Sequence, residues 1–131
     1  MGEKGTYRFS NSTFSDNSAE MGGGISVDGL INSLNIQGCN FIGNEARKYG
    51  GGIGVTPGGV ASPIIINGSN FINNKAKFGG AIFNGNQSLE IRRTVFDSNQ
   101  AEQGAVFASN GQSDLFIVLL LIIYRSEQGF H

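Results

Sequence analysis

The feature that most constrains this chain is one pattern of residues that occurs four times in phase. Each copy has a phenylalanine, an asparagine three residues later, an alanine two residues after that, and then one to three glycines before an apolar residue. The copies contain Phe14, Asn17 and Ala19; Phe41, Asn44 and Ala46; Phe71, Asn74 and Ala76; and Phe96, Asn99 and Ala101. Internal repeats of about 20 to 50 residues are typical of solenoids, propellers and arrays.

Each repeat begins with an apolar residue seven positions before its phenylalanine. The unit starts are Tyr7, Leu34, Ile64 and Leu89, with spacings of 27, 30 and 25 residues. A second apolar residue follows two positions after each start, and this alternation predicts a short strand with one buried face. Spacings of this length favour stacked coils of a solenoid over a series of hairpins.

Two further strands are predicted in each unit. The first leads into the phenylalanine, and a small residue two positions earlier shares the inward face of the ring, so that successive layers can interlock. These small residues are Ser12, Cys39, Ser69 and Thr94. The motif asparagine is expected to end this strand, because Asn tolerates left-handed backbone angles and can bond to the same amide one coil away. The other strand follows the glycines, which supply positive φ or close backbone approach.

Three short strands per turn predict an all-β fold, a single-stranded parallel β-helix of about four coils. Crossovers between parallel strands are right-handed in nearly all proteins, so we expect a right-handed helix. Residues 1–113 are predicted to form the repeats, and residues 114–131 an apolar tail that adds a partial fifth coil or a cap. The longest spacing is explained by VTPGGVASP, Val55–Pro63, which predicts a loop bulging from one corner.

The tail begins in phase with the repeats and then departs from them. Leu115 and Ile117 follow 26 residues after the corresponding apolar pair of the fourth unit, which starts at Leu89. Ile122 is predicted to take the next phenylalanine position, and Arg125 stands where the asparagine would be.

The ten residues Leu115–Tyr124, LFIVLLLIIY, are almost entirely aliphatic. A transmembrane helix needs about 18–20 apolar residues, so this stretch is too short for an ordinary span. We expect a buried terminal strand or a short capping helix. A membrane segment and a departure of the reading frame from the true repeat are the alternatives.

Composition excludes several classes of partner and site. The 10 acidic and 9 basic residues nearly cancel, so no net field attracts nucleic acid or an anionic membrane surface. We therefore expect no nucleic-acid partner. The glycine runs are not followed by a Lys-Ser or Lys-Thr pair, which excludes a phosphate-binding loop. Cys39 is the single cysteine, so no intrachain disulfide is possible.

The residues that could carry catalysis do not form a site in the sequence. His131 is the sole histidine and the last residue, and Cys39 is explained by its place in the row of small inward residues. Arg92 and Arg93 are adjacent, so alternation points at least one of them outward as a solvated charge. Calcium binding or acid–base chemistry needs clustered carboxylates. The aspartates Asp16, Asp28, Asp97 and Asp114 fall at different repeat phases.

We therefore predict no catalytic, cofactor-binding or metal-binding residue, no cofactor and no enzymatic activity.

The repeated FSDN, FIGN, FINN and FDSN, alternating with GGGI, GGGI and GGAI, resemble the polymorphic outer membrane protein repeat of chlamydial surface autotransporters. The resemblance runs from Tyr7 to Ala108, and the last copy, GAVF, departs from it. It implies a right-handed, pectin-lyase-like β-helix displayed at the cell surface, in the outer membrane or outside the cell, for adhesion and antigenic variation. Because the motif residues are structural, no catalytic residue carries over.

The resulting functional hypothesis is a non-enzymatic structural and binding segment of a longer surface-exposed or secreted β-helical protein, similar to an adhesin or autotransporter passenger. Expected partners are a host-cell or extracellular protein or glycan and neighbouring coils of the longer solenoid. Neither a signal peptide at MGEKGTYRF nor a C-terminal barrel is recognisable, so membrane contact is expected only through other regions. The alternatives are a fragment of a polysaccharide lyase or glycoside hydrolase with its catalytic coils elsewhere, and a gene remnant.

Overall fold

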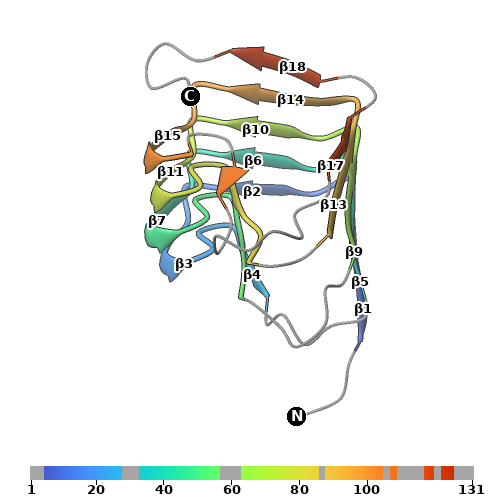
Figure 1. Cartoon of the computed structure of the whole chain (residues 1–131), viewed down its shortest axis with the longest axis horizontal. Helices are drawn as coiled ribbons and strands as arrows, with labels where there is room; N and C mark the ends of the chain where they lie inside the picture. Colours follow the sequence, from blue (N-terminus) through green and yellow to red (C-terminus); the bar gives the residue numbers. More distant parts are fainter. Residues whose placement is uncertain are drawn as a thin grey trace.

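The computed structural model describes residues 5–27, 33–56, 63–85, 88–104, 107–108, 117–119 and 122–125. These residues form strands, turns and bends, with no helix among them. The chain winds in coils, and each strand lies beside its counterpart one coil earlier (Figure 1). Consequently, the side chains that point inward from one coil stack on those of the next.

Among the described residues, four coils contain four strands each, and two further strands begin a fifth coil. The first coil has β1 (Thr6–Ser10), β2 (Thr13–Ser15), β3 (Ser18–Met21) and β4 (Ile25–Val27). The second has β5 (Ser33–Gln37), β6 (Asn40–Ile42), β7 (Glu45–Tyr49) and β8 (Ile53–Val55). The third has β9 (Pro63–Asn67), β10 (Asn70–Ile72), β11 (Lys75–Phe78) and β12 (Ile82–Phe83). The remaining strands are β13 (Ser88–Arg92), β14 (Thr94–Asp97), β15 (Gln100–Gln103), β16 (Phe107–Ala108), β17 (Ile117–Leu119) and β18 (Ile122–Arg125).

The strands assemble into four parallel sheets that run along the solenoid. Their orders are β1-β5-β9-β13-β17, β2-β6-β10-β14-β18, β3-β7-β11-β15 and β4-β8-β12-β16. The four unit starts lie in one register, because Tyr7 pairs with Leu34, Leu34 with Ile64, and Ile64 with Leu89. The all-β parallel solenoid expected from the repeats is therefore confirmed.

The number of strands in each coil differs from the prediction. The structure has four, because the stretch between the motif asparagine and the glycines is itself a strand, β3 in the first coil. These strands have little apolar signal, since the residue buried in β7 and in β11 is the motif alanine. The motif glycines pack directly on the sheet to which these strands belong. A Cβ on Gly51 would lie 2.6 Å from both the backbone N and the backbone O of Lys75, so only glycine fits there.

The phenylalanines form a stacked column inside the solenoid. The ring centroids of Phe14, Phe41, Phe71 and Phe96 are separated by 5.0, 4.6 and 5.1 Å, and neighbouring ring planes differ by 15° or less. The last three rings are fully buried. Phe71 is therefore stacked between Phe41 and Phe96, as its place in the repeat predicts.

The small inward residues form a second column beside the rings. Cys39, Ser69 and Thr94 are buried, which confirms the packing interpretation of the cysteine. These residues also satisfy backbone groups. The Ser69 hydroxyl accepts a hydrogen bond from the Cys39 amide at 3.1 Å and donates to the Asn67 carbonyl at 3.2 Å, while the Thr94 hydroxyl donates to the Arg92 carbonyl at 2.8 Å.

The motif asparagines form a continuous hydrogen-bonded ladder. The Asn74 side-chain oxygen accepts from the backbone N and the side-chain Nδ2 of Asn44, at 3.0 and 3.1 Å. The Asn74 Nδ2 in turn donates to Asn99 Oδ1 at 3.0 Å and to the Phe41 carbonyl at 2.9 Å. Asn17 donates to Asn44 in the same way at the first coil. The predicted amide stacking is confirmed.

The left-handed backbone conformation was expected at the motif asparagine, but it occurs one residue earlier. Positive φ occurs at Asp16, Gly43, Asn73 and Ser98, each directly before a motif asparagine. The turn therefore depends on this preceding residue. The motif asparagine is required instead because one amide must accept from the preceding coil and donate to both neighbouring coils.

The register of the tail also differs from the prediction. β17 pairs Ile117 with Leu89, and β18 pairs Tyr124 with Phe96, so the expected alignment of Leu115 and Ile122 with those positions is wrong by two residues. A shift of two keeps the same residues on the inward face, so alternation alone does not distinguish the two registers.

Other predictions for the tail meet the structure only in part. Arg125 pairs with Asp97, two positions before the predicted asparagine site at Asn99. Two strands of the tail continue existing sheets, and none of the described residues belongs to a helix that could span a membrane. Leu115 and the centre of the Val55–Pro63 loop lie outside the described residues.

Candidate binding surface

The candidate site is the outward face of the third sheet, which consists of β3, β7, β11 and β15. In these strands a polar residue lies on each side of the motif alanine, and alternation turns these polar residues outward. One outward column contains Ser18, Glu45, Lys75 and Gln100, which pair in register. The other contains Glu20, Arg47, Lys77 and Glu102. We call the first set the inner-edge column. The second set, which comes two residues later in each strand, is the outer-edge column.

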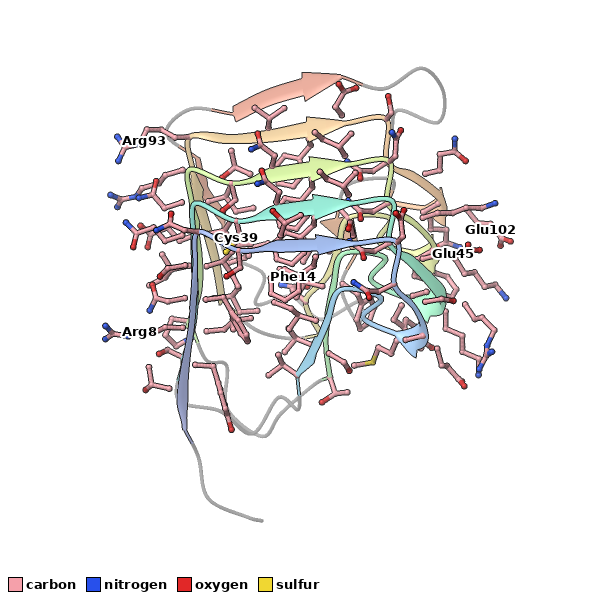
Figure 2. All side chains as sticks on the ribbon, turned by 180° about the vertical axis from the view of Figure 1, so that it is seen from behind. Arg8, Phe14, Cys39, Glu45, Arg93 and Glu102 are labelled. Atoms are coloured by element: carbon pink, nitrogen blue, oxygen red, sulfur yellow. The ribbon has the colours of Figure 1, made fainter. Side chains whose placement is uncertain are left out.

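A groove of about 570 Å³ runs across the strands between the two columns. Its lining consists of residues 45–47, 75–77 and 100–102, three from each of β7, β11 and β15. Alanine is the middle residue of each set, so the groove lies between longer polar and charged side chains. Figure 2 shows Glu45 and Glu102 on this side of the solenoid, with Arg8 and Arg93 on the opposite side.

A β-bulge in β7 adds a cation to the outer-edge column. Two residues, Arg47 and Lys48, lie between Ala46 and Tyr49, where the neighbouring strands each have one. Both cations therefore reach Glu20 on β3. Arg47 Nη2 lies 3.3 Å from Glu20 Oε1, and Lys48 Nζ lies 3.3 Å from Glu20 Oε2. The hydrogen bond from Lys48, and then that from Arg47, lower the pKa of the Glu20 carboxyl.

Lys75 and Lys77 give the middle of the groove a positive charge. Both are exposed, and neither forms an ion pair with another described residue. Lys77 Nζ lies 5.6 Å from the centroid of the Phe78 ring, where a cation–π attraction holds it close to the sheet. With Arg47 and Lys48 on the adjacent strand, these lysines form a cluster of four cations on β7 and β11.

The residues weighed for catalysis in the sequence do not come together. Asp97 shares a register position with Ile72 and Ile42, whereas Asp16 falls one position later in its coil, beside Gly43 in the sequence alignment of the repeats. Within the described ranges, no three acidic, histidine or cysteine side chains are grouped to hold a metal ion. Asp28, Asp114 and His131 lie outside those ranges.

The two adjacent arginines occupy different environments. Arg92 pairs with Glu90 on its own strand, while Arg93 lies exposed at the corner after β13 with a φ of 48°. The prediction that at least one of them is an ordinary solvated charge is confirmed for Arg93.

The groove was missed in the sequence because its strands are short and polar. A usable signal was nevertheless present. SAE, EAR, KAK and QAE surround the motif alanines, and each has a polar residue on either side of a small apolar one. Alternation of this kind indicates a half-buried strand, and a variable polar face is what an exposed binding surface requires.

Comparison with known families supports the repeat assignment. Residues 11–28 and 68–85 match the Chlamydia polymorphic membrane protein repeat, which confirms the resemblance at two of the four copies. No curated protein matches the chain significantly. The same is true of solved structures. The match covers 36 of the 131 residues and identifies these two segments as copies of the repeat.

Proposed function

We propose that this chain, which carries two matched copies of the polymorphic membrane protein repeat, is a non-enzymatic binding module of an adhesin-like solenoid displayed at the cell surface. The observation that carries the proposal is a division of roles between residues. Those that repeat in every coil make contacts between coils, and those that face the solvent change from coil to coil.

The motif residues of the central coils are engaged in contacts with one another. The central phenylalanine rings are fully buried, and the amides of Asn44 and Asn74 bond to the coils on both sides. Buried, fully bonded amides of this kind act as structural elements. The repeats therefore supply a rigid framework, which supports a binding role for the outer faces.

The outward columns have no such constraint. In the outer-edge column the charge changes from Glu20 to Arg47, remains positive at Lys77 and becomes negative at Glu102. Because these side chains are exposed, we expect substitutions at these positions to leave the stacked interior unchanged. A surface protein that must vary its exposed chemistry while keeping its fold is well served by this arrangement.

The first coil supports the proposal that this segment belongs to a longer solenoid. Tyr7 is 45% exposed, whereas Leu34, its counterpart in the second coil, is fully buried. Phe14 is likewise less buried than the rings stacked above it. Solenoids normally cover such open ends with a cap or with further coils. A preceding coil of the same repeat would bury these side chains.

Display at the surface is tested on intact cells that express the natural gene. Antibodies raised against this chain should label unpermeabilised cells, and external protease should remove the label while a cytoplasmic marker stays intact. Labelling only after lysis would contradict surface display. The non-enzymatic part is tested separately, by incubating the purified chain with acidic and neutral glycans. Release of new reducing ends or unsaturated sugars would contradict it.

A further inference from the structure

We infer that the groove across β7, β11 and β15 binds a linear anionic polysaccharide, with Lys75 and Lys77 contacting its carboxylate or sulfate groups. This inference deepens the proposed function, on which it rests for access to extracellular glycans. The chemistry of the groove itself does not depend on where the protein is located.

The shape of the groove suits a linear polymer. The groove crosses three parallel strands that are about 4.8 Å apart, so it runs along the solenoid axis for about 10 Å. Alanines occupy the middle of the lining from each strand. The floor is therefore free of long side chains, and further coils would extend the groove in the same direction.

The positions of the charges suit an anion. Lys75 and Lys77 project from one strand about 6.6 Å apart, since each residue of a strand advances about 3.3 Å. Neither lysine is neutralised by an ion pair with another described residue. Arg47 and Lys48 on the neighbouring strand are partly neutralised by Glu20 and reinforce the positive potential. The lysines are thus the available cations.

The hydrogen bonding of β11 on both of its edges favours a glycan over an extended acidic peptide as the ligand. β11 pairs with β7 on one side and with β15 on the other, so its peptide groups are engaged within the sheet. An added peptide strand needs a free edge, and the floor of the groove does not offer one. Recognition there depends on side-chain charge. Lysine ammonium groups act as point charges that accept anions in varied geometry, which suits carboxylates or sulfates repeated along a sugar chain.

The test measures binding of the full chain to defined probes at about 0.1 M salt, where the Debye length is about 10 Å. Oligogalacturonate supplies carboxylates, dextran sulfate supplies sulfates, and unmodified dextran is the neutral control. We expect both anionic probes to bind. The double variant Lys75→Gln/Lys77→Gln should weaken binding about tenfold, equivalent to about 1.4 kcal/mol.

A matched control removes two cations from the opposite side of the solenoid. Arg8→Gln/Arg93→Gln changes the net charge equally, yet should alter affinity by less than about twofold, because exposed charges this far apart are largely screened. The sign of the effect is tested by Glu45→Gln/Glu102→Gln, which removes the two anions that line the groove and should tighten binding. All four lysine and glutamate positions are solvent-facing, and thermal unfolding verifies that each variant keeps its fold.

Several results would overturn the inference. They are equal weakening by the lysine and arginine variants, equal binding of neutral dextran, and no binding of either anionic probe. Tighter binding of polyglutamate with the same lysine dependence would assign the groove to an acidic peptide instead. The two proposals fail separately. Glycan binding by a protein that stays inside intact cells would contradict surface display only, whereas a surface protein with no glycan binding would contradict only the assignment of the groove.

Discussion

The second sheet, with β2, β6, β10 and β14, and the third sheet, with β3, β7, β11 and β15, belong to the same coils but differ in what they repeat. Inside the second sheet, phenylalanine recurs in each of the four coils at centroid separations of 4.6 to 5.1 Å. On the outside of the third sheet, the corresponding positions hold serine, glutamate, lysine and glutamine in turn.

The comparison shows why the motif consists of buried residues. A ring or an amide in one coil packs against the same group in the next, so changing one copy leaves a cavity or an unpaired polar atom in both neighbours. An outward side chain meets mainly water, and its neighbours impose only weak charge preferences. The interior therefore keeps its residues from coil to coil, and the outer face is free to vary.

The largest expected effect is at the centre of the ring column. Phe71→Ala should lower the free energy of unfolding by about 3–5 kcal/mol, because a fully buried ring is lost between two others. A typical domain has about 5–15 kcal/mol in total, so this loss should open the middle coils. Chemical denaturation measures the change. Phe14→Ala, at the partly exposed end of the column, should cost clearly less, and equal losses would contradict the comparison.

The next effect is in the asparagine ladder. Asn74→Ala should cost about 2–4 kcal/mol, because buried partners in both neighbouring coils each lose a hydrogen bond at about 1–3 kcal/mol. Asn17→Ala is the matched change at the exposed end of the ladder, where water replaces the lost bonds. Denaturation of both variants tests the point. An Asn74 variant as stable as the Asn17 variant would show that the ladder contributes little.

A smaller effect is expected where the glycines return across the third sheet. Gly51→Ala should cost about 1–3 kcal/mol, because its Cβ would lie 2.3 Å from the Gly80 carbonyl oxygen and the backbone must shift. Gly68→Asn is the control. Gly68 has a φ of 61° but open space around it, and Asn tolerates that conformation, so the cost should be about 1 kcal/mol or less. Thermal unfolding compares the two, and a harmless Gly51→Ala would exclude close packing as the reason for the glycine.

The smallest expected effect is a change in the pKa of an exposed carboxyl on the outer face of the third sheet. Lys48→Gln should raise the pKa of the Glu20 carboxyl toward its ordinary value, because Lys48 makes the largest contribution to lowering it. A carboxyl with a lowered pKa in the folded state contributes stability above its unfolded pKa and loses it as the pH falls through the folded pKa. NMR titration of the carboxyl measures the shift. Lys77→Gln is the control, since Lys77 forms no ion pair with Glu20, and equal shifts would show a general field effect.

The sequence predictions were accurate for the buried, stacked residues and less accurate for the short polar strands and the tail. Spacing alone placed the four unit starts in one register, because large apolar residues in phase have few alternative alignments. These unit starts are Tyr7, Leu34, Ile64 and Leu89. The third sheet was missed because its strands offer little inward signal beyond the motif alanine and, in β7 and β11, the partly buried Tyr49 and Phe78. The tail was misaligned by two residues, since Ile117 and Leu115 have the same parity and both are aliphatic.

By itself, the sequence determined the columns that stack. The phase of Phe71, Asn74 and the glycines is a property of spacing, and stacking of like groups requires that spacing. The tertiary structure decided the bulge that brings Arg47 and Lys48 to Glu20, the groove beside Lys75 and Lys77, and the register of the tail. These features depend on how coils 25 to 30 residues apart align across corners of different length. Local alternation contains no information about that alignment, because a slip of two residues preserves it.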